Sequence, residues 1–289
     1  MDYAELLDVI REAAKKGAES ALEAIRFGTA GDILGRGMGG DYSLAGDVAS
    51  EKAVIEYLRA RVGELRVVSE ESGERSFGSA PRYTFIIDPI DGSRNYKRGL
   101  PFFAISIAVA EGETLDDIVA GAVYAPLLNM EFTAIRGMGA WLNGRKIRVT
   151  SQEDLANALV FVGATPKALF LPQAYALAIT IRGGIARSLG SASLELSFVA
   201  SGGADAYIDY WGIMRVIDIA AALLIAREAG AWVKVRGWLD RRGAISLRER
   251  LTILAASTEK LGLRLEEVFR EALNIEFEEM LGGRRDTLR

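Results

Sequence analysis

The chain has 289 residues, of which 50% are hydrophobic and 26% are charged, a composition typical of folded globular proteins. Its net charge of -4 argues against a protein that mainly coats nucleic acid or an anionic membrane surface. No apolar run approaches the roughly 18 residues of a membrane span, and the first five residues are too acidic for a signal peptide. We therefore expect a cytoplasmic protein.

The chain contains neither cysteine nor histidine. These two absences exclude disulfides, thiolate nucleophiles, zinc–sulfur sites and imidazole bases, and with them the usual serine and cysteine triads. Any hydrolysis must then use carboxylates, hydroxyls and metal-activated water. Arginine greatly outnumbers lysine, which fits a heat-loving source and a GC-rich genome equally well.

Hydrophobic spacing predicts a first half with helices at 2–26 and 48–62, a mobile glycine-rich loop at 28–46, and strands at 66–69, 83–88, 104–110, 118–124 and 130–135. The pair Asn143-Gly144 predicts a hairpin. These elements form a predicted N-terminal α+β domain at 1-150.

After Ser151 the pattern changes to strands that alternate with helices. Strands are predicted at 159–163, 184–187, 206–209, 232–235 and 252–256, and helices at 166–182, 191–201, 216–230 and 258–274. We place a domain boundary near Thr150, so that 151-289 forms a C-terminal α/β domain. Two layered halves with a cleft between them are the expected architecture.

Two carboxylates, Asp88 and Asp91, stand three positions apart where the predicted strand 83–88 ends. Carboxylates held this close repel one another unless a cation lies between them, and hard oxygen ligands suit Mg²⁺. Gly92 and Ser93 follow directly and can open a helix whose free amides would face a phosphate. The segment therefore predicts hydrolysis of a phosphate ester.

Four further elements carry polar residues at the ends of predicted strands or helices. They are Glu70 and Glu71 after strand 66–69, Asp218 at the start of an apolar helix, Asp47 at the end of the glycine-rich loop, and Gly190-Ser191-Ala192 at another helix start. Each also has a simpler explanation, namely a solvated acidic loop, a helix cap or close helix packing.

In this order and spacing the segments resemble the inositol monophosphatase superfamily of Mg²⁺-dependent sugar phosphatases, from Asp41 to Asp218 and the following 227–230. The resemblance implies the layered αβαβα sandwich of inositol monophosphatases and fructose-1,6-bisphosphatases. It also implies two or three Mg²⁺ ions, with Mn²⁺ as a substitute. The chain is expected to form a homodimer, with contacts around residues 155–200.

The resemblance also implies roles for individual residues. The metal ligands would be Glu70, Asp88, the carbonyl of Ile90, Asp91 and Asp218, with Asp41 near a third metal. Ser93, Asp47 and Glu70 would orient water, and the amides of Gly92 and Ser93 would hold phosphate. Gly190, Ser191 and Ala192 would contact sugar hydroxyls. Trp211 stands where many inositol monophosphatases have a glutamate.

Arg215, three residues before Asp218, makes this segment similar to the archaeal branch of the family. That branch often hydrolyses both fructose 1,6-bisphosphate and inositol 1-phosphate. Arg215 and Arg187 are candidates to grip a second phosphate, although an ordinary surface position is the simpler explanation for each. The expected partner is a small phosphorylated sugar or polyol, rather than nucleic acid or a membrane.

Three alternative functions stay open. The protein could be an inositol monophosphatase only, or a 3′-phosphoadenosine 5′-phosphate phosphatase. It could also be a non-catalytic protein that uses the same fold to bind a partner. The complete set of expected carboxylates favours an enzyme, because a scaffold freed from catalysis would be expected to lose at least one of them.

Overall fold

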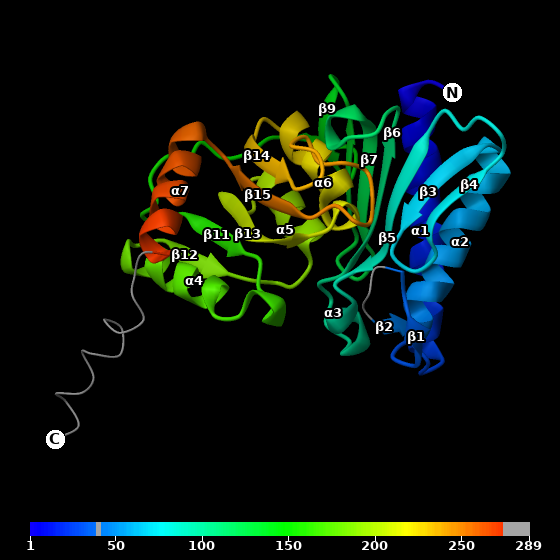
Figure 1. Ribbon diagram of the computed structural model, residues 1–289, viewed down its shortest axis with the longest axis horizontal. Coiled ribbons are helices and arrows are strands. Elements are labelled where there is room, and N and C mark those ends of the chain that lie inside the picture. The colour runs from blue at the N-terminus through cyan, green and yellow to red at the C-terminus, as the bar shows by residue number, and fades with distance from the viewer. Residues whose placement is uncertain (39–41, 274–289) are drawn as a thin grey trace.

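The computed structural model describes residues 1–38 and 42–273. The chain folds into five layers of alternating helices and sheets (Figure 1). In order, the layers are helices α1 (Tyr3–Arg26) and α2 (Ala45–Val62), an eight-stranded sheet, helices α5 (Ala192–Ala200) and α6 (Val216–Glu228), a five-stranded sheet, and helices α4 (Leu171–Ile181) and α7 (Glu259–Leu273). The predicted αβαβα sandwich is confirmed.

The eight-stranded sheet has the order β10-β9-β8-β7-β6-β5-β3-β4. Its strands are β3 (Leu65–Ser69), β4 (Gly73–Phe77), β5 (Thr84–Asp91), β6 (Ala104–Ala110), β7 (Ile118–Ala125), β8 (Met130–Ile135), β9 (Gly139–Leu142) and β10 (Arg145–Ile147). Only the β3–β5 pair among these is parallel. Strands β3 and β5 therefore end at the same edge of the sheet, where their polar residues come together.

The five-stranded sheet has the order β12-β11-β13-β15-β14. Its strands are β11 (Leu159–Val162), β12 (Ile185–Arg187), β13 (Ala206–Met214), β14 (Trp232–Gly237) and β15 (Leu251–Ala256). Strand β11 runs parallel to both neighbours, whereas β15 is antiparallel to β13 and β14.

The burial of each helix follows from its layer. Helix α1 is capped by Asp2 and Glu5 and buries one apolar stripe, because only one of its sides meets the sheet. Helix α6 lies between the two sheets and is buried along nearly its whole length. A helix that is apolar on all sides needs such cover, which makes Asp218 in its first turn an unusual residue. Among residues 1–38 and 42–273, no helix is long and apolar enough to span a membrane.

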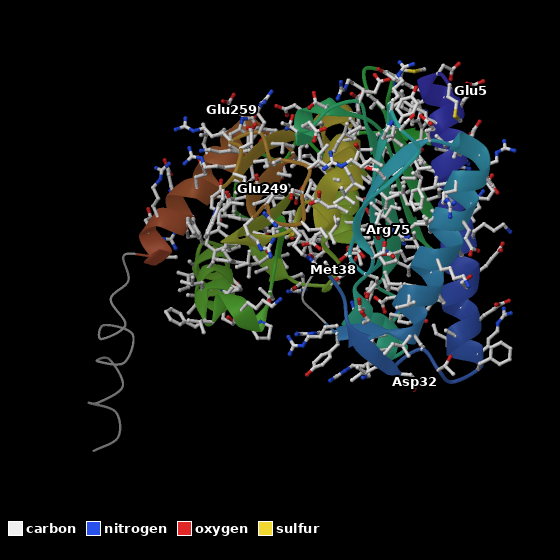
Figure 2. All side chains as sticks on the ribbon, turned by 45° about the vertical axis from the view of Figure 1, so that its right-hand side comes forward. Glu5, Asp32, Met38, Arg75, Glu249 and Glu259 are labelled. Carbon is white, nitrogen blue, oxygen red and sulfur yellow. The ribbon has the colours of Figure 1, made fainter. Side chains whose placement is uncertain are left out.

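The predicted mobile loop at 28–46 was wrong in part. The structure has a short antiparallel hairpin there, β1 (Ile33–Arg36) and β2 (Tyr42–Leu44), and α2 begins at Ala45. All four residues of β1 are exposed, so the sequence has no alternation of apolar and polar residues that would predict this strand. In Figure 2 Met38 lies beyond β1, and its N–H donates to the carbonyl of Glu71 at 3.3 Å. Asp41 lies outside the described residues.

The predicted helix at 166–182 was also wrong in part. A 3₁₀ turn at Pro166–Ala168 precedes α4, which begins only at Leu171. Leu169 separates the two with a positive φ of 56°, which a continuous helix cannot contain. The predicted Asn143-Gly144 hairpin is confirmed, because both residues have positive φ as a type I′ turn requires.

Candidate active site

The end of β5 carries a β-bulge within the Asp-Pro-Ile-Asp segment. Asp88 pairs with Ser106 but Asp91 pairs with Ala104, so β5 has one residue more than β6 over this stretch. Residues three apart on a regular strand point to opposite faces, and the extra residue removes that alternation. Asp88, Asp91 and Ile90 therefore line the same cavity. The strand runs three residues further than the sequence predicted.

Most of the predicted site residues meet around this cavity of about 440 Å³. It is lined by Asp47 from α2, Glu70 after β3, Asp88, Ile90 and Asp91 from β5, Gly92 and Ser93 at the start of α3 (Ser93–Lys97), Gly190 before α5, and Arg215 before α6. A neighbouring cavity of about 330 Å³ shares Asp91, Gly190 and Arg215, and Asp218, Ser191 and Ala192 also line it. The two cavities form one cleft.

Asp91 is held by the N-terminus of α5. The hydroxyls of Ser191 and Ser193 and the N–H of Ser193 all donate to Asp91 Oδ2, at 2.6–2.7 Å. Hydrogen bonds at the positive end of a helix favour the carboxylate, but burial outweighs them and raises the pKa of Asp91. The hydroxyl of Ser191 therefore positions Asp91, and its contact with a sugar hydroxyl stays a prediction.

The turn that carries Glu70 is fixed by Glu51, a buried residue of α2. Its carboxylate accepts the N–H groups of Glu71 and Ser72 at 3.0 Å, and also the hydroxyl of Ser69. Sequence reasoning missed Glu51. The sequence feature that could have identified Glu51 is its spacing of four residues from Asp47, which places both carboxylates on one face of α2.

The Ser93 hydroxyl oxygen lies 2.9 Å from Asp47 Oδ1 and 2.9 Å from the carbonyl oxygen of Ile90. One hydroxyl proton serves only one acceptor at a time. The other oxygen of Asp47, Oδ2, is buried and has no hydrogen-bond partner among the described residues. Burial raises the pKa of Asp47 to about 7, and the Ser93 hydrogen bond opposes that rise.

The site holds more negative than positive charge. Burial raises the pKa of Glu70 to about 7 and that of Asp88 well above its usual value, with further increases from Asp218 and from Glu70 respectively. An unpartnered buried oxygen and several hard carboxylate oxygens around one cavity fit Mg²⁺. Among the described residues, however, no three carboxylates are yet close enough to share one ion.

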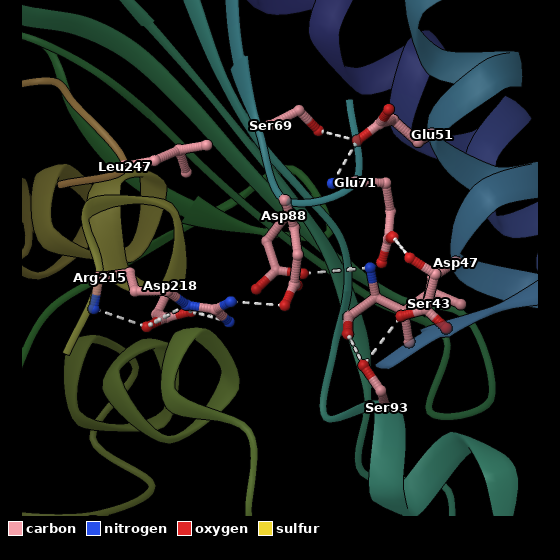
Figure 3. Close-up of polar contacts among 12 residues, drawn as sticks. Ser43, Asp47, Glu51, Ser69, Glu71, Asp88, Ser93, Arg215, Asp218 and Leu247 are labelled. Carbon is pink, nitrogen blue, oxygen red and sulfur yellow. Dashed lines mark hydrogen bonds and ion pairs between the residues drawn. The ribbon is translucent and has the colours of Figure 1, made fainter. Parts of the chain in front are cut away.

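The Arg215 side chain contacts two of the expected ligands, Glu70 and Asp218, and Figure 3 shows it beside Asp218. Its guanidinium donates to Asp218 Oδ1 from Nε at 3.1 Å and from Nη2 at 2.8 Å, and its Nη1 lies 2.5 Å from Glu70 Oε1. The backbone N–H of Arg215 also donates to Asp218 Oδ2, at 2.7 Å. Arg215 therefore connects the end of β3 to the start of α6.

Residues 2–271 match the model of the inositol monophosphatase family. The chain belongs to this family. It is 38% identical to the Nus factor SuhB of Xylella fastidiosa over 197 residues, 67% of this chain and 68% of that protein. It is 32% identical to the fructose-1,6-bisphosphatase/inositol-1-monophosphatase of Methanothermobacter thermautotrophicus over 255 residues, 85% and 88% of the two chains. The crystal structure of suhB from Bartonella henselae superposes with a TM-score of 0.78 at 28% identity, covering 92% of this chain and 99% of that one.

Two residues named in the sequence analysis, Arg187 and Trp211, line neither of the two cavities of this inositol monophosphatase family member. Arg187 on β12 is exposed, its Nη1 donates to the carbonyl of Ala186, and it lines a separate hollow of about 200 Å³. The indole N–H of Trp211 donates to the carbonyl of Gly163 at 2.6 Å, so this side chain fastens β13 to the loop after β11.

Three residues that sequence reasoning missed line the smaller cavity: Lys167, Asp209 and Arg250. Burial raises the pKa of Asp209 to about 7. Lys167 also lines the larger cavity. The sequence around each of these residues has no recognisable motif. Only the fold brings them to the cleft.

The loop before α5 is anchored by residues that are themselves buried or half-buried. Asn95 Nδ2 donates to the carbonyl of Leu189 at 2.7 Å, and Glu195 accepts the N–H groups of Leu189 and Gly190. Gly190 has a φ of 81°, a conformation that glycine adopts without strain. Its backbone therefore faces both cavities from a fixed position.

Proposed function

We propose that the protein is a Mg²⁺-dependent phosphatase that hydrolyses both fructose 1,6-bisphosphate and inositol 1-phosphate. The observation that carries this proposal is the gathering of Glu70, Asp88, Asp91 and Asp218 along one cleft in a member of the inositol monophosphatase family. These four carboxylates and the Ile90 carbonyl would hold two or three Mg²⁺ ions, with Mn²⁺ as a substitute. When bound, the ions neutralise phosphate charge and promote the ionisation of water.

The chain's own residues position the attacking water and the phosphate. In the proposal the hydroxyl of Ser93, fixed between Asp47 and the Ile90 carbonyl, orients the water. Asp47, with a pKa of about 7, can hold the proton that is released. The first amides of a helix have no partner within it, so those at the start of α3 are available to phosphate oxygens.

The smaller cavity is the proposed place of the substrate's remaining groups. Its lining combines carboxylate and cationic side chains, with Asp209 for hydroxyl groups and Lys167 and Arg250 for a second phosphate. This assignment replaces Arg187, which lies elsewhere. The name of the Methanothermobacter relative, which joins both activities, supports the choice of these two substrates.

A second candidate function is partner binding by the same fold. The observation in its favour is the 38% identity to a protein named as a Nus factor. Against it stands the complete carboxylate set, because several buried carboxylates close together are costly and would be lost once catalysis no longer selected for them. Phosphate release decides between the two.

We also propose that the chain forms a homodimer through the surface around α4. Large apolar residues are exposed there, namely Leu169 (73%), Phe170 (54%), Leu177 (48%), Ile181 (73%) and Ile185 (41%). Exposed apolar patches of this kind mark protein interfaces. Light scattering should give a dimer for the wild type and a monomer for Ile181→Asp, whereas a monomeric wild type would contradict the proposal.

The enzyme proposal is tested by phosphate release from inositol 1-phosphate with Mg²⁺, with a chelator, and with the Asp91→Asn variant. Release that needs both Mg²⁺ and Asp91 supports it. If inositol 1-phosphate and fructose 1,6-bisphosphate both stay intact, the proposal fails. The next substrate would then be 3′-phosphoadenosine 5′-phosphate, and inactivity there would leave partner binding.

A further inference from the structure

Arg215 holds the oxygen atoms that the proposed metals need. Its guanidinium contacts Glu70 Oε1 on one side and both oxygens of Asp218 on the other. The side chains are largely shielded from water, with exposed fractions of 16% for Arg215, 10% for Glu70 and 14% for Asp218. The contact is therefore weakly screened and stabilises the present arrangement.

These contacts and metal binding exclude each other in part. Mg²⁺ binds carboxylate oxygens at about 2.1 Å and tolerates little distortion of its octahedral shell. An oxygen that already accepts two guanidinium N–H groups, as Asp218 Oδ1 does, has few lone-pair directions left for an ion. A guanidinium and a divalent cation this close would also repel. The ion pair to Glu70 must therefore open before both carboxylates can bind a metal.

The cleft has space into which the Arg215 side chain can move. Arg215 lines both the larger and the smaller cavity, and it precedes α6 as the N-cap residue with extended backbone angles, φ -95° and ψ 159°. A rotation of its side chain would carry the guanidinium towards the smaller cavity without unwinding the helix. Arg215 thus contacts the buried carboxylates and also borders the space into which its guanidinium can move.

We infer that Arg215 is a built-in substitute for the cation, which pairs Glu70 with Asp218 in the metal-free protein and is displaced when Mg²⁺ binds. This inference rests on the proposed function, because it takes these carboxylates as Mg²⁺ ligands. It makes Arg215 a residue that stabilises the empty site and weakens metal affinity, in place of the second-phosphate role expected from the sequence.

The test compares wild type, Arg215→Gln and Arg227→Gln by calorimetric Mg²⁺ titration and by thermal unfolding, with and without saturating Mg²⁺, at one fixed pH near 8. Arg227 is the matched control, since it lies on the same helix and pairs with Asp116 at 3.0 Å on the surface. We expect Arg215→Gln to bind Mg²⁺ roughly tenfold more tightly, since one charge-assisted hydrogen bond no longer has to be broken. Its melting temperature should be lower without metal and match the wild type with Mg²⁺, while Arg227→Gln should leave Mg²⁺ affinity unchanged.

Other results would contradict either the inference about Arg215 or the proposed metal site. Weaker Mg²⁺ binding by Arg215→Gln would show that Arg215 positions Asp218 for the metal, which contradicts the inference. An equal loss of melting temperature with and without Mg²⁺ would make Arg215 purely structural, and also contradicts it. A wild type that binds no Mg²⁺ would refute the metal site of the proposed function itself. Arg215→Lys should fall between wild type and Arg215→Gln, because lysine keeps the charge but not the planar fork.

Discussion

The hydroxyl of Ser93 joins Asp47 on α2 to the bulged end of β5, at 2.9 Å from Asp47 Oδ1 and 2.9 Å from the Ile90 carbonyl oxygen. If this hydroxyl orients the attacking water, Ser93→Ala should lower kcat by about 10²–10⁴-fold with little change in KM. Ser93→Thr should retain much of the activity. The control is Ser201→Ala, which removes a hydroxyl that donates to the Phe198 carbonyl at 3.2 Å. Equal kcat for Ser93→Ala and wild type would remove Ser93 from the reaction.

The metal-free protein should lose stability as pH rises towards 8. Burial raises the pKa of Asp47, Glu70 and Asp209 to about 7 and that of Glu195 to about 8, whereas in the unfolded chain each titrates near about 4. The folded state therefore binds more protons between these values, and stability falls as they are released. Melting temperature should drop by several degrees between about pH 5.5 and pH 8.5.

Two comparisons check the cause of that drop. Asp47→Asn should make the pH dependence shallower, because one titrating carboxyl is gone. Saturating Mg²⁺ should also reduce it, because a cation favours ionised ligands. A melting temperature that is constant over this range without metal, or that rises, would contradict the picture of an excess of buried carboxylates.

How far the sequence predicted the site depended on whether its residues follow one another. Asp88, Asp91, Gly92 and Ser93 form a continuous segment, and the structure places all four on the larger cavity. The sequence showed neither the bulge that brings Asp88 and Asp91 to the same side nor the further three residues of β5. Bulges depend on the partner strand, so single-strand patterns do not reveal them.

Contacts between residues far apart in the chain could not be predicted either, because they also depend on a partner segment. Arg215 was expected to grip a second phosphate, which stays a prediction, and its contact with Glu70, 145 residues away in the chain, was not apparent from the sequence. Hydrophobic periods distinguish helices from strands and so predicted most of the elements, whereas the layered αβαβα sandwich was predicted from the family resemblance. The exposed strand β1 lacks any such period. The division into domains at 1-150 and 151-289 stays a prediction.

Glu51 should matter for metal affinity although it lines neither cavity. It fixes the turn of Glu70 through the N–H groups of Glu71 and Ser72. Glu51→Gln should weaken Mg²⁺ binding about 10–100-fold, the usual effect of losing a partner that orients ligands. Glu56→Gln, on the same helix, serves as the control. Calorimetric titration measures both, and equal affinities would show that the turn holds without Glu51.

The second-phosphate assignment predicts a selective defect. Lys167→Ala and Arg250→Ala should each lower kcat/KM for fructose 1,6-bisphosphate about tenfold or more, the loss of one charge-assisted contact. For inositol 1-phosphate the change should be small, since that substrate has one phosphate only. Lys260→Ala, which removes a surface lysine paired with Glu153, controls for lost charge. Equal losses on both substrates would assign these residues to general binding.

The Mg²⁺-dependent phosphatase activity is tested most directly by phosphate release from fructose 1,6-bisphosphate and inositol 1-phosphate, measured side by side as Mg²⁺ is titrated. We expect turnover of both substrates, none with a chelator, and a loss on the order of 10²–10³-fold or more in Asp91→Asn. Asp8→Asn, on the exposed face of α1, should be unaffected. Turnover that persists in Asp91→Asn or without any divalent metal, or no turnover of either substrate by the wild type, would show that the protein is not a Mg²⁺-dependent phosphatase of this kind.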